Sequence, residues 1–239
     1  MLNITLISTI HSEIGKCNSD ELYKIIEFIN PEVIFEELPS HLSDIIYSES
    51  FDMLYTNSIP LNRRLIAPTD VPLELKCMKK YLQNHNIKHI PVDIDVSPEL
   101  SENEKEMFAT FNKYDDYKKL EQEQYLLTRQ YGFDYLNSDK YLDVLEEKEI
   151  IEKNIVESKI HKDIFHTYKL FRAEHYDNRE NAMLQNIYNY SKENQYNRAV
   201  FLIGAGHRKS VMQKITEHEK TSEIKLNWTI YGSKQKTGL

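Results

Sequence analysis

Residues 1–39 read MLNITLISTIHSEIGKCNSDELYKIIEFINPEVIFEELP, and this stretch decides the fold. Asn3–Ile10 is rich in alternating β-branched residues, a pattern that predicts a strand. A polar turn containing Gly15 follows, and after it come apolar residues at helical spacing. Glu32–Phe35 is predicted to be a short buried strand, since three of its four residues are apolar. A strand, a helix and a second strand in this order form the βαβ unit of a parallel sheet.

Further strands are predicted on both sides of a long helical stretch. Lys88–Ile94 is the third predicted strand, Arg198–Ile203 the fourth and Ile224–Tyr231 the last. Because strands alternate with helices around the first unit, we predict an α/β fold. Its core is a central, mainly parallel sheet flanked by helices, and it carries a large helical insertion.

The predicted insertion consists of charged helical segments with no strand pattern between them. Its first helix is expected over Glu102–Leu127 and its last over Asp177–Glu193. The expected organisation is residues 1–100 as the N-terminal part of the α/β core, 101–194 as the helical insertion or cap, and 195–239 as the strands and helix that complete the core.

Composition excludes some classes of protein. The net charge of −8 disfavours a general nucleic-acid-binding surface, because attraction to phosphates dominates such binding. No apolar run reaches the ~18 residues of a transmembrane helix, and the N-terminus resembles a strand more than a signal peptide. Cys17 and Cys77 form no disulfide framework, so we expect a cytoplasmic protein with free thiols. The oligomeric state is left open.

Candidate functional residues gather where the predicted strands end. His11 follows the first strand, Glu36 and Glu37 end the second, and His207 closes a Gly204-Ala205-Gly206-His207 turn after the fourth. Ligands of open α/β sheets bind at the carboxyl ends of the strands. Two imidazoles beside carboxylates suit either general acid–base chemistry or a divalent metal.

Each of these residues also has a purely structural interpretation. Glu36 and Glu37 are neighbours in a strand, so at most one of them faces a given site. Asp93 and Asp95 share a face if the third strand continues through them, and one of them would then orient a histidine. A turn-forming aspartate or a histidine that merely ends a strand are the alternatives. The remaining histidines are expected on the surface or in packing: His41, His85, His89, His161, His166, His175 and His218.

Arg179 lies near the start of a predicted helix, with Asp177 or Asn178 as its cap. A cation is disfavoured at a helix N-terminus by the macrodipole. Arg179 is therefore expected to have a partner, either a carboxylate or a bound anion, unless it lies on a solvated face.

Four short segments resemble a known superfamily. It joins the TraB/PrgY pheromone-shutdown proteins, the Tiki proteases, the erythromycin esterases and the ChaN haem-binding proteins. The resemblance lies in the order of a strand-end histidine, a strand ending in Glu-Leu, an arginine-containing helix start and a terminal Gly-x-x-His. Ser8 replaces the first glycine of the family pattern. The four segments are Ser8–His11, Pro31–Leu38, Asp177–Met183 and Arg198–His207.

The resemblance implies an α/β core with a helical insertion and a cleft that holds His11, Glu37, Arg179 and His207. It favours Glu37 over Glu36 as the site carboxylate. It does not determine the activity, since the relatives include metal-dependent peptidases, metal-independent hydrolases and haem-binding proteins.

The leading functional hypothesis is a hydrolase of the peptidase or esterase type that acts on a small molecule or a peptide. One histidine and Glu37 would activate water directly, or His11, Glu37 and His207 would hold a divalent metal that does so. Arg179 would stabilise the developing anion. One alternative is a non-catalytic protein that binds haem or a peptide in the same cleft. Another is an interaction module that uses the helical insertion. Among substrates, a phosphoester is least favoured by the acidic balance.

Overall fold

The computed structural model describes residues 2–41, 71–94, 100–158 and 162–232. Five parallel strands form one sheet in the order β3-β2-β4-β1-β5, with helices on both of its faces. The predicted α/β class is therefore confirmed. The strands are β1 (Leu2–Thr9), β2 (Val33–Pro39), β3 (Lys88–Asp93), β4 (Arg198–Gly204) and β5 (Leu226–Ile230).

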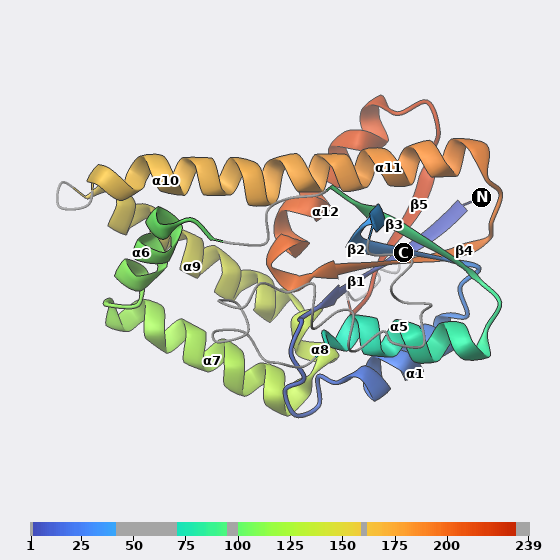
Figure 1. The fold of residues 1–239 in the computed structure, drawn as a ribbon, viewed down its shortest axis with the longest axis horizontal. Coiled ribbons are helices and arrows are strands. Elements are labelled where there is room, and N and C mark those ends of the chain that lie inside the picture. The colour runs from blue at the N-terminus through green and yellow to red at the C-terminus, as the bar shows by residue number, and fades with distance from the viewer. Residues whose placement is uncertain (1, 42–70, 95–99, 159–161, 233–239) are drawn as a thin grey trace, which may run out of the picture.

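Helices make up most of the rest of the described chain (Figure 1). They are α1 (Ser19–Ile29), α5 (Leu73–Asn84), α6 (Glu102–Phe111), α7 (Asp115–Tyr131), α8 (Phe133–Leu136), α9 (Asp139–Glu157), α10 (Lys162–Arg172), the π-helical turn η1 (Ala173–Asn178), α11 (Arg179–Glu193), the short 3-10 helix η2 (Ala205–His207) and α12 (Arg208–Thr221).

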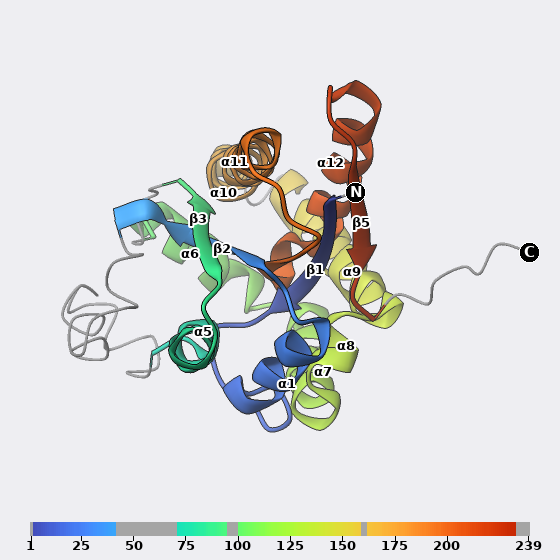
Figure 2. The ribbon, with the colours of Figure 1, turned by 90° about the vertical axis from the view of Figure 1, so that its right-hand side faces the viewer.

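Side chains alternate along the strands, so each face of the sheet has its own apolar core. On one face, Leu184 of α11 and Val211 of α12 pack against Phe35 and Phe201. On the other face, α1, α5 and α8 pack against residues such as Ile34. Figure 2 shows α11 and α12 on one side of the strands and α1, α5 and α8 on the other. Both faces are covered, as parallel sheets require.

The helices between β3 and β4 form a third core of their own. Met107 of α6, Tyr117 of α7, Ile155 of α9 and Tyr168 of α10 are buried against one another there. The predicted helix over Glu102–Leu127 is wrong in one respect, because the chain breaks between α6 and α7. Two aspartates in the first turn of α7 favour a new helix start at that place.

The segment from α10 to α11 is one continuous helix that passes over both the helical core and the sheet (Figure 1). The predicted helix start at Asp177 or Asn178 is therefore wrong. Asn178 has helical dihedral angles, φ −66° and ψ −45°, and its side chain caps nothing. Instead, the six residues of η1 widen the helix, a feature that is often found at functional sites.

The order of the strands determines where a site can form. β1 and β4 are neighbours, and Thr9 is paired with Gly204 at their carboxyl ends. The helix after β1 packs on one face of the sheet, and the helix after β4 packs on the other. Such a switch point opens a crevice between the two strand ends, where ligands of α/β proteins bind.

None of the helices in the described ranges is both long enough and apolar enough to span a membrane.

Candidate functional site

The carboxyl ends of the central strands border a pocket of about 940 Å³. His11 reaches this pocket from the turn after β1, Glu37 from β2 and His207 from the turn after β4. Arg179 reaches it from α11. The structure thus brings together four side chains that lie far apart in the sequence. Of the two neighbouring glutamates at the end of β2, only Glu37 lines the pocket.

Arg179 joins two carboxylates from neighbouring strands. Its Nη2 donates to Glu37 Oε1 and to Asp93 Oδ2, each at 2.5 Å, and its Nε donates to Asp93 Oδ2 at 3.1 Å. Burial favours a lower pKa for Arg179, but Asp93 and Glu37 outweigh it and raise that pKa, so the guanidinium stays charged. Arg179 therefore has carboxylate partners, and they come from β3 and β2.

Glu37 is held from several sides. Its Oε2 accepts a hydrogen bond from the backbone N–H of Gly204 at 2.6 Å. A Cβ atom at Gly204 would lie 3.2 Å from this oxygen, so glycine permits the close approach. Burial favours a higher pKa for Glu37, but His207, Arg179 and His11 together hold it well below its usual range. Glu37 is therefore an ionised carboxylate, and a weak base.

His207 lies between two carboxylates. Its Nδ1 is 2.8 Å from Glu180 Oε1, and its Nε2 is 3.4 Å from Glu37 Oε1. The imidazolium form, which carries a proton on each nitrogen, satisfies both contacts. Burial favours a lower pKa, but Glu180 and Glu37 raise the pKa of His207 to about 9. At neutral pH the ring is a cation that can donate a proton.

Glu180 is a site residue that the sequence analysis did not identify. Its side chain has no exposed surface, and it accepts hydrogen bonds from Ser210 at 2.6 Å and from Lys214 at 2.6 Å, besides its contact with His207. Burial favours a higher pKa for Glu180, but His207, Lys214 and Ser210 lower it. In the sequence, only its position next to Arg179 points to Glu180 as a site residue.

His11 is held by a second carboxylate that the sequence analysis missed. Its Nδ1 is 3.1 Å from Glu74 Oε1, and the same oxygen accepts a hydrogen bond from the Thr9 hydroxyl at 2.8 Å. The backbone N–H of Leu73 donates to the His11 carbonyl at 2.9 Å, which ties the turn after β1 to the start of α5. The charge and the hydrogen bond of Glu74 raise the pKa of His11 to about 9.

The two histidine–carboxylate pairs differ in their exposure to water. The side chain of His11 is 72% exposed and that of His207 is 9% exposed. Water therefore screens the His11–Glu74 pair more than the His207 pairs. Among the residues that the structure describes, no hydrogen bond to Nε2 of His11 is formed. This nitrogen is the one that can exchange a proton with a substrate or a water molecule, and it can accept a proton once the ring has become neutral, near its pKa of about 9.

Glu36, Asp93 and Asp95 are the other carboxylates predicted near the site. Glu36 faces the α5 side and pairs with the buried side chain of His89, so it lies away from the pocket. His89 is thus one of the packing histidines, with a carboxylate partner in β2. Asp93 binds Arg179, so it orients the arginine and no histidine. Asp95 lies outside the described residues.

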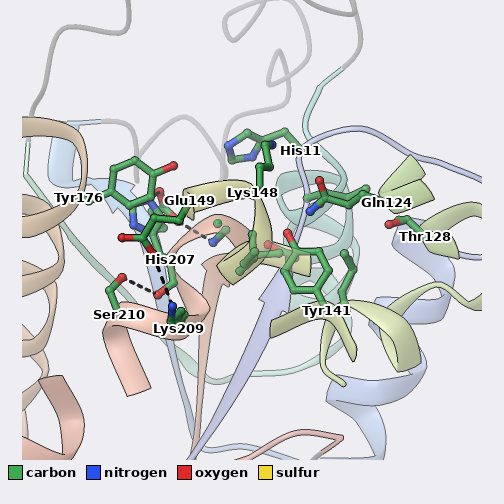
Figure 3. A pocket seen from close by; sticks show the side chains of 18 of the residues that line it. His11, Gln124, Thr128, Tyr141, Lys148, Glu149, Tyr176, His207, Lys209 and Ser210 are labelled. Atoms are coloured by element: carbon green, nitrogen blue, oxygen red, sulfur yellow. Dashed lines mark hydrogen bonds and ion pairs between the residues drawn. The ribbon is translucent and has the colours of Figure 1, made fainter. Parts of the chain in front are cut away.

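The wall of the pocket comes from the helical segment. In Figure 3, Tyr176 and His207 lie on one side of the pocket, and Gln124 and Tyr141 lie on the other. The ring centroids of Tyr176 and His207 are 4.8 Å apart, at an angle of 46°. Tyr141 of α9 and Tyr176 of η1 both line the pocket. The helical segment therefore shapes the space above the strand ends.

The donor set does not fit a divalent metal held by His11, Glu37 and His207. Both nitrogens of His207 face carboxylates, and the guanidinium of Arg179 already lies beside Glu37 as a cation. A metal ligand must be a neutral imidazole, whereas the carboxylates on both sides of His207 favour its protonated form. Within the described ranges, no group of three or more His, Cys, Asp or Glu side chains is arranged to hold a metal.

Comparison of the chain with protein-family models, with curated proteins and with solved structures found no match.

Proposed function

We propose that the protein is a hydrolase of the esterase or peptidase type that acts on a small acyl compound or a peptide. One observation carries the proposal. Two imidazoles, each held at Nδ1 by a buried carboxylate, line one pocket together with the Arg179 guanidinium. A carboxylate that holds one ring nitrogen orients the other for proton transfer. Acid–base chemistry at an acyl group needs such a base, an acid and a fixed positive charge.

His11 is the proposed general base. Glu74 engages its Nδ1, so Nε2 can accept a proton from a water molecule once the ring has lost its own, which a pKa of about 9 places at alkaline pH. The oxygen of that water attacks the acyl carbon while the proton moves to His11 Nε2. The large exposure of this side chain gives the attacking water direct access. Glu74 stabilises the imidazolium that forms.

His207 and Arg179 are proposed to act on the other side of the acyl group. The positive charge of Arg179 stabilises the negative charge that develops on the acyl oxygen. The imidazolium of His207 gives its Nε2 proton to the leaving oxygen or nitrogen. The products are a carboxylic acid and an alcohol or amine. His11 then releases its proton to solvent, and His207 takes one up, so the protons balance.

Hydrolysis of a small substrate panel tests the proposal. Aryl esters, a lactone and dipeptide amides are offered to the wild-type chain and to the His11→Ala and His207→Ala variants. At least one class is expected to be hydrolysed, and each variant should lose at least ~100-fold in kcat/KM, the usual contribution of a general acid or base.

His166→Ala is the matched control, because His166 is exposed on α10 and does not line the pocket. It should hydrolyse the panel like the wild type. Equal activity of all four proteins, or no turnover of any class, would exclude the proposed reaction. Circular dichroism spectra of the variants separate loss of a catalytic group from loss of the fold.

A second candidate function, non-catalytic haem binding, is favoured by His11 alone. In metal-ligating histidines, the N–H group of the other ring nitrogen usually donates a hydrogen bond to a carboxylate. Nδ1 of His11 has such a contact with Glu74. Haem added to the wild-type chain would then give a Soret shift that His11→Ala abolishes and His166→Ala retains. If haem keeps the absorption spectrum of free haem in the presence of each of the three proteins, this alternative is excluded.

A further inference from the structure

Arg172 is a pocket-lining cation that forms no hydrogen bond with any other residue in the described ranges. It reaches the pocket from the last turn of α10, one residue before the π-helical turn. Among the described residues, no carboxylate lies within ion-pair distance of its guanidinium, whereas Arg179, Lys148, Lys209 and Lys214 in the same pocket all have carboxylate partners. Arg172 is therefore the arginine of this pocket that is free to bind an incoming anion.

Tyr176 holds the guanidinium of Arg172 in a defined orientation. The central carbon of the guanidinium lies 4.1 Å from the centroid of the Tyr176 ring. Stacking on an aromatic face engages the flat side of a guanidinium and leaves its N–H groups pointing outward at the edge. Tyr176 also contacts His207, at 4.8 Å between ring centroids. Arg172, Tyr176 and His207 thus form a continuous row along one wall of the pocket.

The charges around Arg172 favour one kind of anion. Glu149 and Glu152 also line the pocket. Burial raises the pKa of Glu152, although the charge of Arg172 acts against it. At Glu149, the effect of burial is outweighed by Lys153 and Arg172, which lower the pKa. Two nearby carboxylates repel a dianionic phosphate more strongly than a monoanion. A carboxylate also matches the planar fork of an arginine in a bidentate contact.

We propose that Arg172 and Tyr176 form a subsite for the carboxylate of an acidic substrate. This inference rests on the proposed function, and it names the substrate class as acyl compounds that carry a carboxylate away from the bond that is cleaved. Arg172 and Arg179 are seven residues apart on one helix, on the order of 10 Å along its axis. A chain of about six carbon atoms is ~6 Å long when extended, and hydrogen bonds of ~3 Å from its two ends to the guanidinium groups bridge the remainder of that separation.

Direct binding tests the subsite without any need for turnover. The probes are phenylacetate, its neutral isostere phenylacetamide and phenyl phosphate, each titrated into the full chain by calorimetry. Phenylacetate is expected to bind the wild type about tenfold or more tightly than either of the other two. Arg172→Met should abolish this preference, and Arg172→Lys should retain only part of it, because lysine keeps the charge but loses the fork.

Lys169→Met is the matched control, since it removes one positive charge from the same helix outside the pocket. It should bind phenylacetate like the wild type. An unchanged preference in Arg172→Met would overturn the subsite, and so would equal binding of the acid and the amide by the wild type. Tighter binding of phenyl phosphate would overturn the assignment to a carboxylate.

Kinetics with two matched esters separate this inference from the proposed function. The 4-nitrophenyl monoester of adipic acid and 4-nitrophenyl hexanoate differ only in the terminal carboxylate. Arg172→Met should raise KM for the adipate ester about tenfold, with little change in kcat or in the kinetics of the hexanoate ester. Hydrolysis of both esters without this discrimination would overturn the subsite alone. Carboxylate binding without hydrolysis of either ester would overturn only the reaction.

Discussion

Nδ1 of His207 lies 2.8 Å from Oε1 of Glu180, the residue directly after Arg179 in the chain. Two consecutive residues of α11 therefore supply a carboxylate to one nitrogen of His207 and a cation near the other, since Arg179 Nη1 lies 3.5 Å from Nε2. Glu37 joins the cluster through both Arg179 and His207. The protonation of His207 is thus controlled by side chains from β2 and α11.

Replacing Glu180 by Gln should lower the pKa of His207. The variant keeps the volume of the side chain but removes the charge that favours the imidazolium. We expect the pKa to fall from about 9 by about one unit or more, as measured by NMR titration of the His207 ring protons. Glu193→Gln, at the exposed end of α11, serves as the control. A His207 titration that is unchanged in Glu180→Gln would show that Glu180 does not control this ring.

The stability of the protein should depend on pH through His207. Its pKa in the folded state, about 9, lies above the ordinary value of 6.5, so protonation favours the folded state. The contribution is fully present below about pH 6.5 and is lost as the pH rises through about 9, with a size on the order of 3 kcal/mol.

Denaturant unfolding of the wild type and of His207→Gln at several pH values measures this contribution. The difference in the free energy of unfolding between the two proteins should be largest below pH 6.5 and should shrink toward pH 10, because only the wild type carries the titrating ring. A difference that is independent of pH would contradict the prediction.

The pH dependence of hydrolysis should show a maximum on the alkaline side of neutrality. The rate should rise as His11 loses its proton, because it acts as base, and should fall as His207 loses its proton, because it acts as acid. Glu74→Gln removes the charge that raises the pKa of His11, so the rising limb of kcat/KM should move to lower pH. The falling limb should stay in place. Movement of the falling limb alone would show that the two roles are reversed.

Arg179→Met should destabilise the fold. It leaves Glu37 and Asp93, which are 10% and 3% exposed, without the guanidinium that neutralises them. Removal of one partner from a buried ion pair costs about 3–5 kcal/mol, and the cost should be smaller at pH 5 than at pH 8, since acid protonates the carboxylates. Unfolding in guanidinium chloride measures the loss. Lys169→Met should change the stability by less than ~0.5 kcal/mol. A loss of less than ~0.5 kcal/mol in Arg179→Met would contradict the prediction, because water would then replace the guanidinium beside Glu37 and Asp93.

The sequence predicts the parts of the site that follow strands. His11, Glu37 and His207 each end an apolar β run, and the carboxyl ends of parallel strands meet at one edge of the sheet. Glu74 and Glu180 could not be found in this way. Both are helical carboxylates, and the sequence contains many of those, so only the fold shows which two lie against a histidine.

Arg179 was correctly predicted to have a partner, but the helix start on which that prediction depended is not present in the fold. The macrodipole disfavours a cation only at a helix start, and the chain is helical on both sides of Arg179. Asp177 and Asn178 are common capping residues, and nothing local reveals that they continue the helix through a π-helical turn. Arg179 does have carboxylate partners, but these are Glu37 and Asp93, which lie in strands more than 80 residues away along the chain.

The continuous helix from α10 to α11 connects two parts of the molecule that have separate cores. Its first half is anchored in the helical core through Tyr168, and its second half rests on the sheet through Leu184. The widened turn between them carries Tyr176, and Arg179 follows it directly. Any displacement of one core against the other would have to bend or twist this shared rod. Because Tyr176 and Arg179 line the pocket, such a bend or twist would displace residues of the pocket wall.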